Sequence, residues 1–140
     1  MDINEEHHPD IIGDVQAMDS INTNSFDVVL AAELFEHVND PQKGLQECYR
    51  ILKKDGLLII TVPFLYPIHG DPCDYTRWTE TKWKTEFSNI GFTIEKQEIT
   101  GYFFTILGDM LKNLIKVLPK LYRKILKYSI TVLNLVVKLD

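Results

Sequence analysis

Apolar residues gather in short continuous runs in the first half of the chain. Phe26–Ala32 is such a run, interrupted only by Asp27, and this pattern is typical of a strand that is covered on both faces. Leu57–Val62 is a second run of the same kind and is closed by Pro63. A shorter strand is expected over Asp10–Val15, between a proline and a polar loop.

A helix is predicted between the two long runs. Asp40 is placed to cap it, and Pro41 fits the first helical position. Apolar residues recur there with helical spacing, and Gly56 stands where a C-terminal glycine is expected after about fourteen residues: Leu45, Cys48, Tyr49 and Leu52. A strand, a helix and a strand in this order predict a βαβ unit, and therefore a parallel sheet with a right-handed crossover.

The second half begins with a long loop, Phe64–Trp78. Thr79 then caps a predicted helix that ends at Gly91. Phe92–Ile99 alternates apolar and polar residues, which predicts an edge strand with one face in water. From Phe103 onward the pattern is helical and basic.

The composition is that of an ordinary globular protein. Of the 140 residues, 45% are hydrophobic and 25% are charged, which excludes a disordered or collagen-like chain. The net charge of −5 argues against nucleic acid as the main partner. The charge is unevenly distributed, because residues 1–100 carry 8 Lys and Arg against 18 Asp and Glu, whereas residues 101–140 carry 7 against 2.

The two cysteines, Cys48 and Cys73, are too few for a disulfide framework or a zinc ribbon. The N-terminus is acidic and polar, so it does not resemble a secretory signal. The longest uncharged runs fall short of the roughly 18–20 apolar residues that span a bilayer. We therefore expect a cytoplasmic protein without a transmembrane segment.

Polar residues follow the predicted strands at their carboxyl ends, where open parallel sheets bind ligands. They are Asp14 with Val15, Ala32 with Glu33, and the loop that starts at Pro63. Carboxylates at such an edge suit a ligand with ribose hydroxyls and an exocyclic amine. The alternative is that Asp14 belongs to a turn and Glu33 is a solvated strand end.

Four motifs follow one another in a characteristic order: Asp14, Ser25–Val28, Glu36–Pro41 (E-H-V-N-D-P) and Glu47–Gly56. Together they resemble the S-adenosylmethionine-dependent methyltransferases of the broad type 11 Rossmann-like group, over residues 10 to 99. The later stretch PFLYPIHGDPCDYTRWT resembles a subgroup that acts on sugars, surface polysaccharides or lipids. The resemblance implies an α/β fold of the class I methyltransferase type, with a mostly parallel sheet and S-adenosylmethionine as cofactor.

The resemblance also implies roles for individual residues. Asp14 would accept a hydrogen bond from the adenine amine, and the Val15 backbone N–H would approach the adenine ring. Ala32 and Glu33 would line the methionine end of the cofactor, and Asp2 would bind the ribose diol.

One family motif has no counterpart in this sequence. The family binds the methionine moiety on a G-x-G loop after its first strand, and none of the seven glycines forms such a pair. We therefore expect a methyltransferase-like domain over residues 1–102 that is truncated at its N-terminus and binds the cofactor poorly. A C-terminal helical tail is expected over residues 103–140.

The long loop carries the candidate residues for the acceptor side. Histidine is the usual proton acceptor near neutral pH, so His69 is the candidate base for a hydroxyl acceptor. Asp71 and Asp74 could orient it, Tyr75 could line the acceptor pocket, and Arg77 could clamp an anionic group. The alternative is that Asp74, Tyr75 and Arg77 pin the loop by hydrogen bonds.

His37 is a further candidate substrate-binding residue, although packing at the start of the helix is an equal alternative. His7 and His8 suggest a metal site with His37, His69 and Asp71, but no ligand spacing such as H-x-x-x-H is present. No metal site is predicted.

The basic C-terminal segment has an amphipathic pattern over residues 108–138. Such helices can lie on an anionic membrane surface, whereas the alternative is a helical hairpin packed on the sheet or on a partner. Two functional classes therefore stay open: methyl transfer, and a non-catalytic membrane-associated or protein-interaction module on the same scaffold.

Overall fold

A computed structural model describes residues 1–70, 73–101, 103–119 and 122. These residues fall into two compact units. The first comprises Met1–Phe64 and His69–Glu95, and the second comprises Leu65–Ile68 and the chain from Lys96 onward. Each unit is described by itself, and the expected boundary between residues 102 and 103 stays a prediction.

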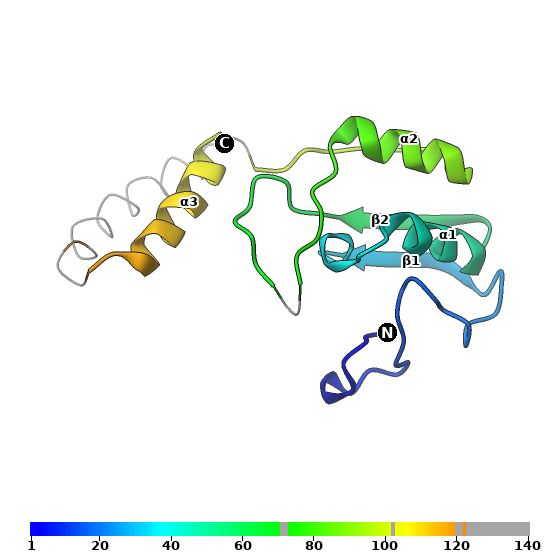
Figure 1. Ribbon diagram of the computed structural model, residues 1–140. Coiled ribbons are helices and arrows are strands. Elements are labelled where there is room, and N and C mark those ends of the chain that lie inside the picture. The colour runs from blue at the N-terminus through cyan, green and yellow to red at the C-terminus, as the bar shows by residue number, and fades with distance from the viewer. Residues whose placement is uncertain (71–72, 102, 120–121, 123–140) are drawn as a thin grey trace. The chain divides into compact units, whose positions relative to one another are not determined.

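The first unit contains the predicted strand–helix–strand arrangement (Figure 1). Its elements in chain order are β1 (Phe26–Ala32), α1 (Pro41–Ile51), β2 (Leu52–Thr61) and α2 (Glu80–Ile90). The strands β1 and β2 are parallel, with Val28 opposite Leu57 and Ala32 opposite Thr61. The parallel sheet and its helical crossover are therefore confirmed.

The helix α1 begins as predicted but ends earlier. Asp40 Oδ1 accepts a hydrogen bond from the Lys43 backbone N–H at 3.3 Å, and Pro41 is the first helical residue. The helix ends at Ile51, so the expectation of a longer helix closed by Gly56 is wrong. Gly56 lies instead within β2, where a Cβ atom would stand 2.9 Å from the Lys53 carbonyl oxygen and 3.1 Å from that of Asp27. Glycine is required there by close backbone approach.

The helix α2 is confirmed with both of its predicted ends. Thr79 accepts a hydrogen bond from the Lys82 N–H, and Gly91 follows the helix with a φ of 113°. The strand expected over Phe92–Ile99 is wrong, because these residues form neither helix nor strand. The strand expected over Asp10–Val15 is also wrong: the segment makes only isolated bridges, Asp2 with Ile12 and Asp14 with Ala17.

The sheet of the first unit has one covered and one open face. Val29 and Ala31 of β1, with Leu58 and Ile60 of β2, belong to or pack against the hydrophobic core. The alternate residues are exposed, contrary to the expectation of strands covered on both faces: Val28, Leu30, Leu57 and Ile59. The core itself is formed by the N-terminal segment, η2 (Phe35–His37) and α1. A further 3₁₀ turn, η1, covers Glu5–His7.

The second unit contains α3 (Phe103–Val117), which confirms a helix from Phe103. Gly108 and Ile115 are its buried residues. The second part of the predicted tail helix, and with it most of the predicted membrane face at 108–138, lies outside the described residues. Within the described part of the chain, every helix is too short or too polar to cross a membrane.

Candidate functional site

The end of β1 turns sharply into η2. Glu33 adopts a left-handed conformation with a φ of 48°, and its N–H donates to the Thr61 carbonyl at 2.9 Å. Ala32, the last residue of β1, is exposed. The turn brings Phe35 into the core, where it is fully buried, and so fixes the position of the two residues that follow it.

Glu36 is the first of these residues, and it is 2% exposed. Its backbone carbonyl accepts a hydrogen bond from the Tyr75 N–H at 2.7 Å, which ties η2 to the long loop. Neither of its carboxylate oxygens has a hydrogen-bond partner among the described residues. A buried carboxylate without a donor is rare in folded proteins and calls for an explanation.

His37 lies between the loop and Glu36. Its Nδ1 is 2.5 Å from the Cys73 carbonyl oxygen, so Nδ1 donates there. Its Nε2 is 3.7 Å from Glu36 Oε1. The His37 ring also meets the His69 ring edge to face, with ring centroids 5.0 Å apart. The fold therefore brings together two histidines that are far apart in the sequence.

Asp74 and Arg77 hold His69 in place. The His69 backbone N–H donates to Asp74 Oδ2 at 3.0 Å, and His69 Nδ1 lies 3.3 Å from the same oxygen. Both terminal nitrogens of Arg77 donate hydrogen bonds to the Asp74 carboxylate, and Nη2 is 2.6 Å from Oδ2. The Arg77 guanidinium and the His69 N–H lower the pKa of Asp74 from 3.8 to about 2, so the carboxylate stays ionised.

The remaining predicted acceptor-side residues are only partly gathered. The guanidinium of Arg77 is engaged by Asp74, which is the loop-pinning alternative of the sequence prediction. The Tyr75 side chain is exposed, and the neighbouring Cys73 thiol raises its pKa. Asp71 lies outside the described residues.

The predicted cofactor carboxylates lie in the N-terminal segment, where both make local contacts. Asp2 Oδ1 accepts from the Asn4 N–H at 2.9 Å, and Oδ2 is 2.8 Å from His7 Nδ1. These two contacts lower the pKa of Asp2. Asp14 Oδ1 accepts from the Gln16 N–H at 2.8 Å, an Asx turn of the kind given above as the alternative.

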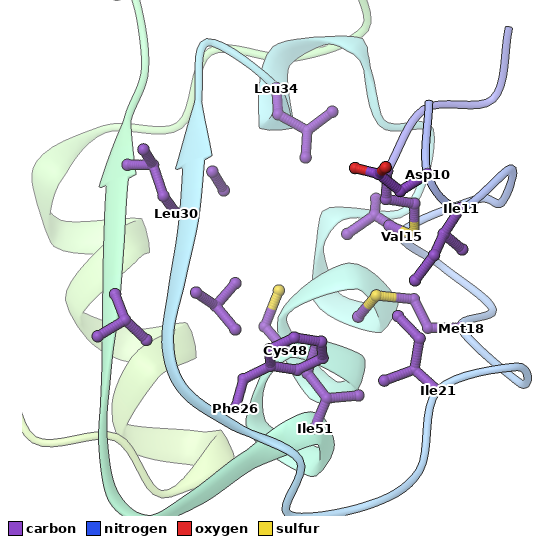
Figure 2. Close-up of a pocket in the computed structure, with 14 residues that line it drawn as sticks. Asp10, Ile11, Val15, Met18, Ile21, Phe26, Leu30, Leu34, Cys48 and Ile51 are labelled. Atoms are coloured by element: carbon purple, nitrogen blue, oxygen red, sulfur yellow. The ribbon is translucent and has the colours of Figure 1, made fainter. Parts of the chain in front are cut away.

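A groove of about 430 Å³ runs beside the free edge of β1. Figure 2 shows Phe26 and Leu30 of β1 on one side and Ile11 and Met18 of the N-terminal segment on the other. Val15 is the one predicted cofactor residue that lines it. Apart from Asp10, the groove is lined by apolar and sulfur-containing side chains.

Residues 2–60 match the family described as "Methyltransferase domain". This part of the chain is similar to that family. Curated relatives include the ubiquinone biosynthesis O-methyltransferases of Glaesserella parasuis, 42% identical, and of Rattus norvegicus mitochondria, 48% identical, each over 40 residues. These matches cover 29% of this chain but only 17% and 12% of the two relatives.

Solved structures agree with the methyltransferase fold. A Haloferax volcanii protein assigned as a methyltransferase, in complex with the Trm112 methyltransferase activator, superposes with a TM-score of 0.56 at 25% identity. The match covers 70% of this chain and 48% of that one. A Bacillus halodurans protein, also assigned as a methyltransferase, has a TM-score of 0.56 at 21% identity, covering 81% of this chain and 59% of its own.

Methyltransferase domains of this family use S-adenosylmethionine in general, so the groove can be tested against that molecule. Its apolar walls fit the flat face of a nucleoside. The methionine end carries a carboxylate, for which the described groove lining holds no cationic side chain and the sequence holds no G-x-G loop. The described residues therefore fit the nucleoside end of the cofactor but not its amino-acid end.

Sequence reasoning missed Glu36 as a functional candidate, although the residue lies in the E-H-V-N-D-P motif. A glutamate beside a histidine at the start of a helix is usually solvated. What buries Glu36 is the insertion of Phe35 into the core together with the backbone contact to Tyr75. Both are tertiary effects, and the motif itself is the one sign of them that can be found in the sequence.

Proposed function

We propose that this chain is part of an S-adenosylmethionine-dependent methyltransferase that methylates a hydroxyl group. The main support for this proposal is the family match over residues 2–60, which covers β1, α1 and most of β2. In this proposal the nucleoside end of the cofactor occupies the groove beside β1, close to Val15. Ala32 and Glu33, at the end of the same strand, face the reacting end, and Asp2 and Asp14 contribute once their local contacts are released.

The acceptor side is assigned to the residues that gather around η2. His69 is the proposed proton acceptor, and Asp74 orients it through Nδ1. His37 and Tyr75 are the proposed contacts to the acceptor, and Arg77 acts through Asp74. A hydroxyl acceptor is favoured because the curated relatives are O-methyltransferases. Sugars, polysaccharides and lipids all offer such a hydroxyl, and they are the proposed acceptor classes.

Cofactor binding is tested by calorimetry with S-adenosylmethionine and, separately, with S-adenosylhomocysteine. Leu30 lines the groove, whereas its register partner Ile59 does not, although both are exposed. We expect Leu30→Lys to weaken binding about tenfold or more, since it places a charged side chain at an apolar wall. Ile59→Lys is the matched control and leaves binding unchanged.

The absence of heat from the unaltered chain with both ligands would contradict a groove that binds the cofactor without a G-x-G loop. Equal weakening by Leu30→Lys and Ile59→Lys would contradict its location in the groove. Either result would favour a non-catalytic role for the scaffold.

A second proposal concerns membrane contact through α3 and the basic residues after it. Apolar side chains are exposed along α3, among them Phe103, Met110, Leu114 and Val117. Lysines at such a helix favour anionic lipid. Co-sedimentation with phosphatidylserine vesicles tests the idea: Lys112→Glu with Lys116→Glu should reduce the bound fraction, and unchanged sedimentation would show that the membrane contact is wrong.

A further inference from the structure

Three potential metal ligands meet where η2 contacts the long loop. One ligand atom from each of Glu36, His37 and His69 lies within 4.8 Å of the other two. A carboxylate with two imidazoles is a ligand set for zinc and for other divalent transition metals. The three residues are parts of one compact unit, so their arrangement is a property of that unit.

The strongest sign that this cluster binds something is the state of Glu36. Its side chain is 1% exposed, and neither carboxylate oxygen receives a hydrogen bond within the described residues. The other buried glutamate of the unit, Glu86, has Lys82 on its Oε1. A carboxylate taken out of water needs a donor or a cation, and Glu36 has no donor among the described residues.

His37 presents a lone pair to that carboxylate. Because Nδ1 donates to the Cys73 carbonyl, the neutral ring carries its lone pair on Nε2. This nitrogen lies 3.7 Å from Glu36 Oε1. Two ligands on a tetrahedral zinc, each at about 2.1 Å, are about 3.4 Å apart. The observed separation therefore needs only a small contraction to bind a cation.

His69 is oriented by a carboxylate, as metal-binding histidines commonly are. Its Nδ1 faces Asp74 Oδ2 at 3.3 Å, and Arg77 holds Asp74 from the other side. Carboxylate contacts of this kind fix the ring and direct the other nitrogen to the metal. The edge-to-face contact between the two rings places His69 next to His37.

We propose that Glu36, His37 and His69 bind a divalent transition-metal cation, zinc foremost, with a fourth position open to water or to an acceptor oxygen. With a metal bound, His69 would be a metal ligand instead of a proton acceptor. The metal would then make the hydroxyl group of the methyl acceptor more acidic. Metal binding itself does not rest on the proposed methyl transfer.

The test is metal binding by the untagged full chain, measured without cofactor. Zinc is titrated calorimetrically in competition with a chromophoric chelator, and cobalt is added as a probe whose visible absorption reports tetrahedral nitrogen and oxygen ligation. We expect one zinc per chain, a cobalt band and a higher melting temperature with zinc. His37→Gln, His69→Gln and Glu36→Gln should each weaken zinc binding at least tenfold and abolish the band.

Two control variants separate this site from adventitious binding. His7→Gln removes an imidazole that contacts Asp2, and Cys73→Ser removes an exposed thiol close to the cluster. Neither should change zinc affinity, and circular dichroism verifies that every variant is folded. No cobalt band, or equal zinc affinity in the control and cluster variants, would overturn the proposal. If the chain binds the metal but not the cofactor, the proposed metal site stands and only the proposed cofactor site in the groove is wrong.

Discussion

The two sides of β1 are built in different ways. On the covered side, Glu36, His37, His69 and Asp74 are held by contacts between residues more than thirty positions apart or by buried charges. On the N-terminal side, the groove beside the free edge of β1 has apolar walls that include core residues, and the nearby carboxylates are engaged by residues two to five positions away. The covered side is therefore organised by tertiary structure, whereas the N-terminal side is organised by local turns.

This difference bears on which half of the proposed site is ready to bind. Side chains that already hold the binding geometry lose little conformational entropy when a ligand binds. The carboxylates of the N-terminal segment must first leave their local turns. Asp2 and Asp14 would have to exchange their present contacts for a ribose or an adenine. We therefore expect the covered side to bind its ligand as it stands and the N-terminal side to bind weakly.

The largest effect is expected from removing the side chain on which the covered side depends. Phe35 is fully buried and meets the Trp83 ring edge to face at 5.8 Å. Phe35→Ala should lower the free energy of unfolding by about 3–5 kcal/mol, because it leaves a cavity in the core. Leu30→Ala, at a side chain that is 66% exposed, should lower it by about 1 kcal/mol at most. Urea unfolding followed by tryptophan fluorescence measures both, and equal losses would contradict the contrast between the two sides.

Glu36→Gln should have the next largest effect, and in the opposite direction. The measurement is made with a chelator present, so that the site holds no metal. The substitution removes a buried charge that has no donor among the described residues and supplies an amide N–H next to His37 Nε2. The free energy of unfolding should rise by about 1–3 kcal/mol. Glu86→Gln is the matched variant and should be slightly destabilising, because Glu86 is bonded to Lys82. A loss of stability in Glu36→Gln would show that the carboxylate has a partner in the native protein.

The elements around the site were largely predictable from local patterns, whereas the site itself was not. Asp40, Pro41, Thr79 and Gly91 act through their own backbone neighbours, so their sequence spacing was sufficient to place helix starts and one helix end. The end of α1 was misplaced because Gly56 has two possible roles, and only the approach of the Asp27 carbonyl decides between them. The strand expected over Phe92–Ile99 fails for a related reason: alternation predicts a strand only where a partner strand is present to pair with it.

The candidate site shows the same limit. His37, His69, Asp74 and Arg77 were selected for their chemistry, and the fold does bring them together. That Asp74 faces Arg77 was one of two sequence alternatives, and local spacing alone did not decide between them. The burial of Glu36 was not predictable, because it depends on which face of a three-residue turn meets the core.

A smaller effect, confined to acid pH, is expected from Asp74. Its pKa is about 2 in the folded protein against an ordinary 3.8, so its contribution to stability is complete above the ordinary value and is lost as the pH falls toward 2. Asp74→Asn should therefore show a smaller drop in the urea midpoint between about pH 5 and about pH 2.5 than the unaltered chain. Asp14→Asn is the control, because that carboxylate is exposed and its side chain bonds only to Gln16 among the described residues. Identical acid slopes in all three proteins would show that the Asp74–Arg77 pair is not formed in solution.

The smallest effect on stability is expected on the open face of the sheet. Leu30 and Ile59 are register partners with exposed side chains, so Leu30→Thr with Ile59→Thr leaves a β-branched residue at both positions and removes little buried area. The free energy of unfolding should change by about 0.5 kcal/mol or less. Concentration-dependent light scattering should fall, since exposed apolar strands favour association. A loss of stability comparable to that of Phe35→Ala would instead mean that this face is covered in the folded protein. The two sides of β1 would then differ in what packs against them and not in how they are built.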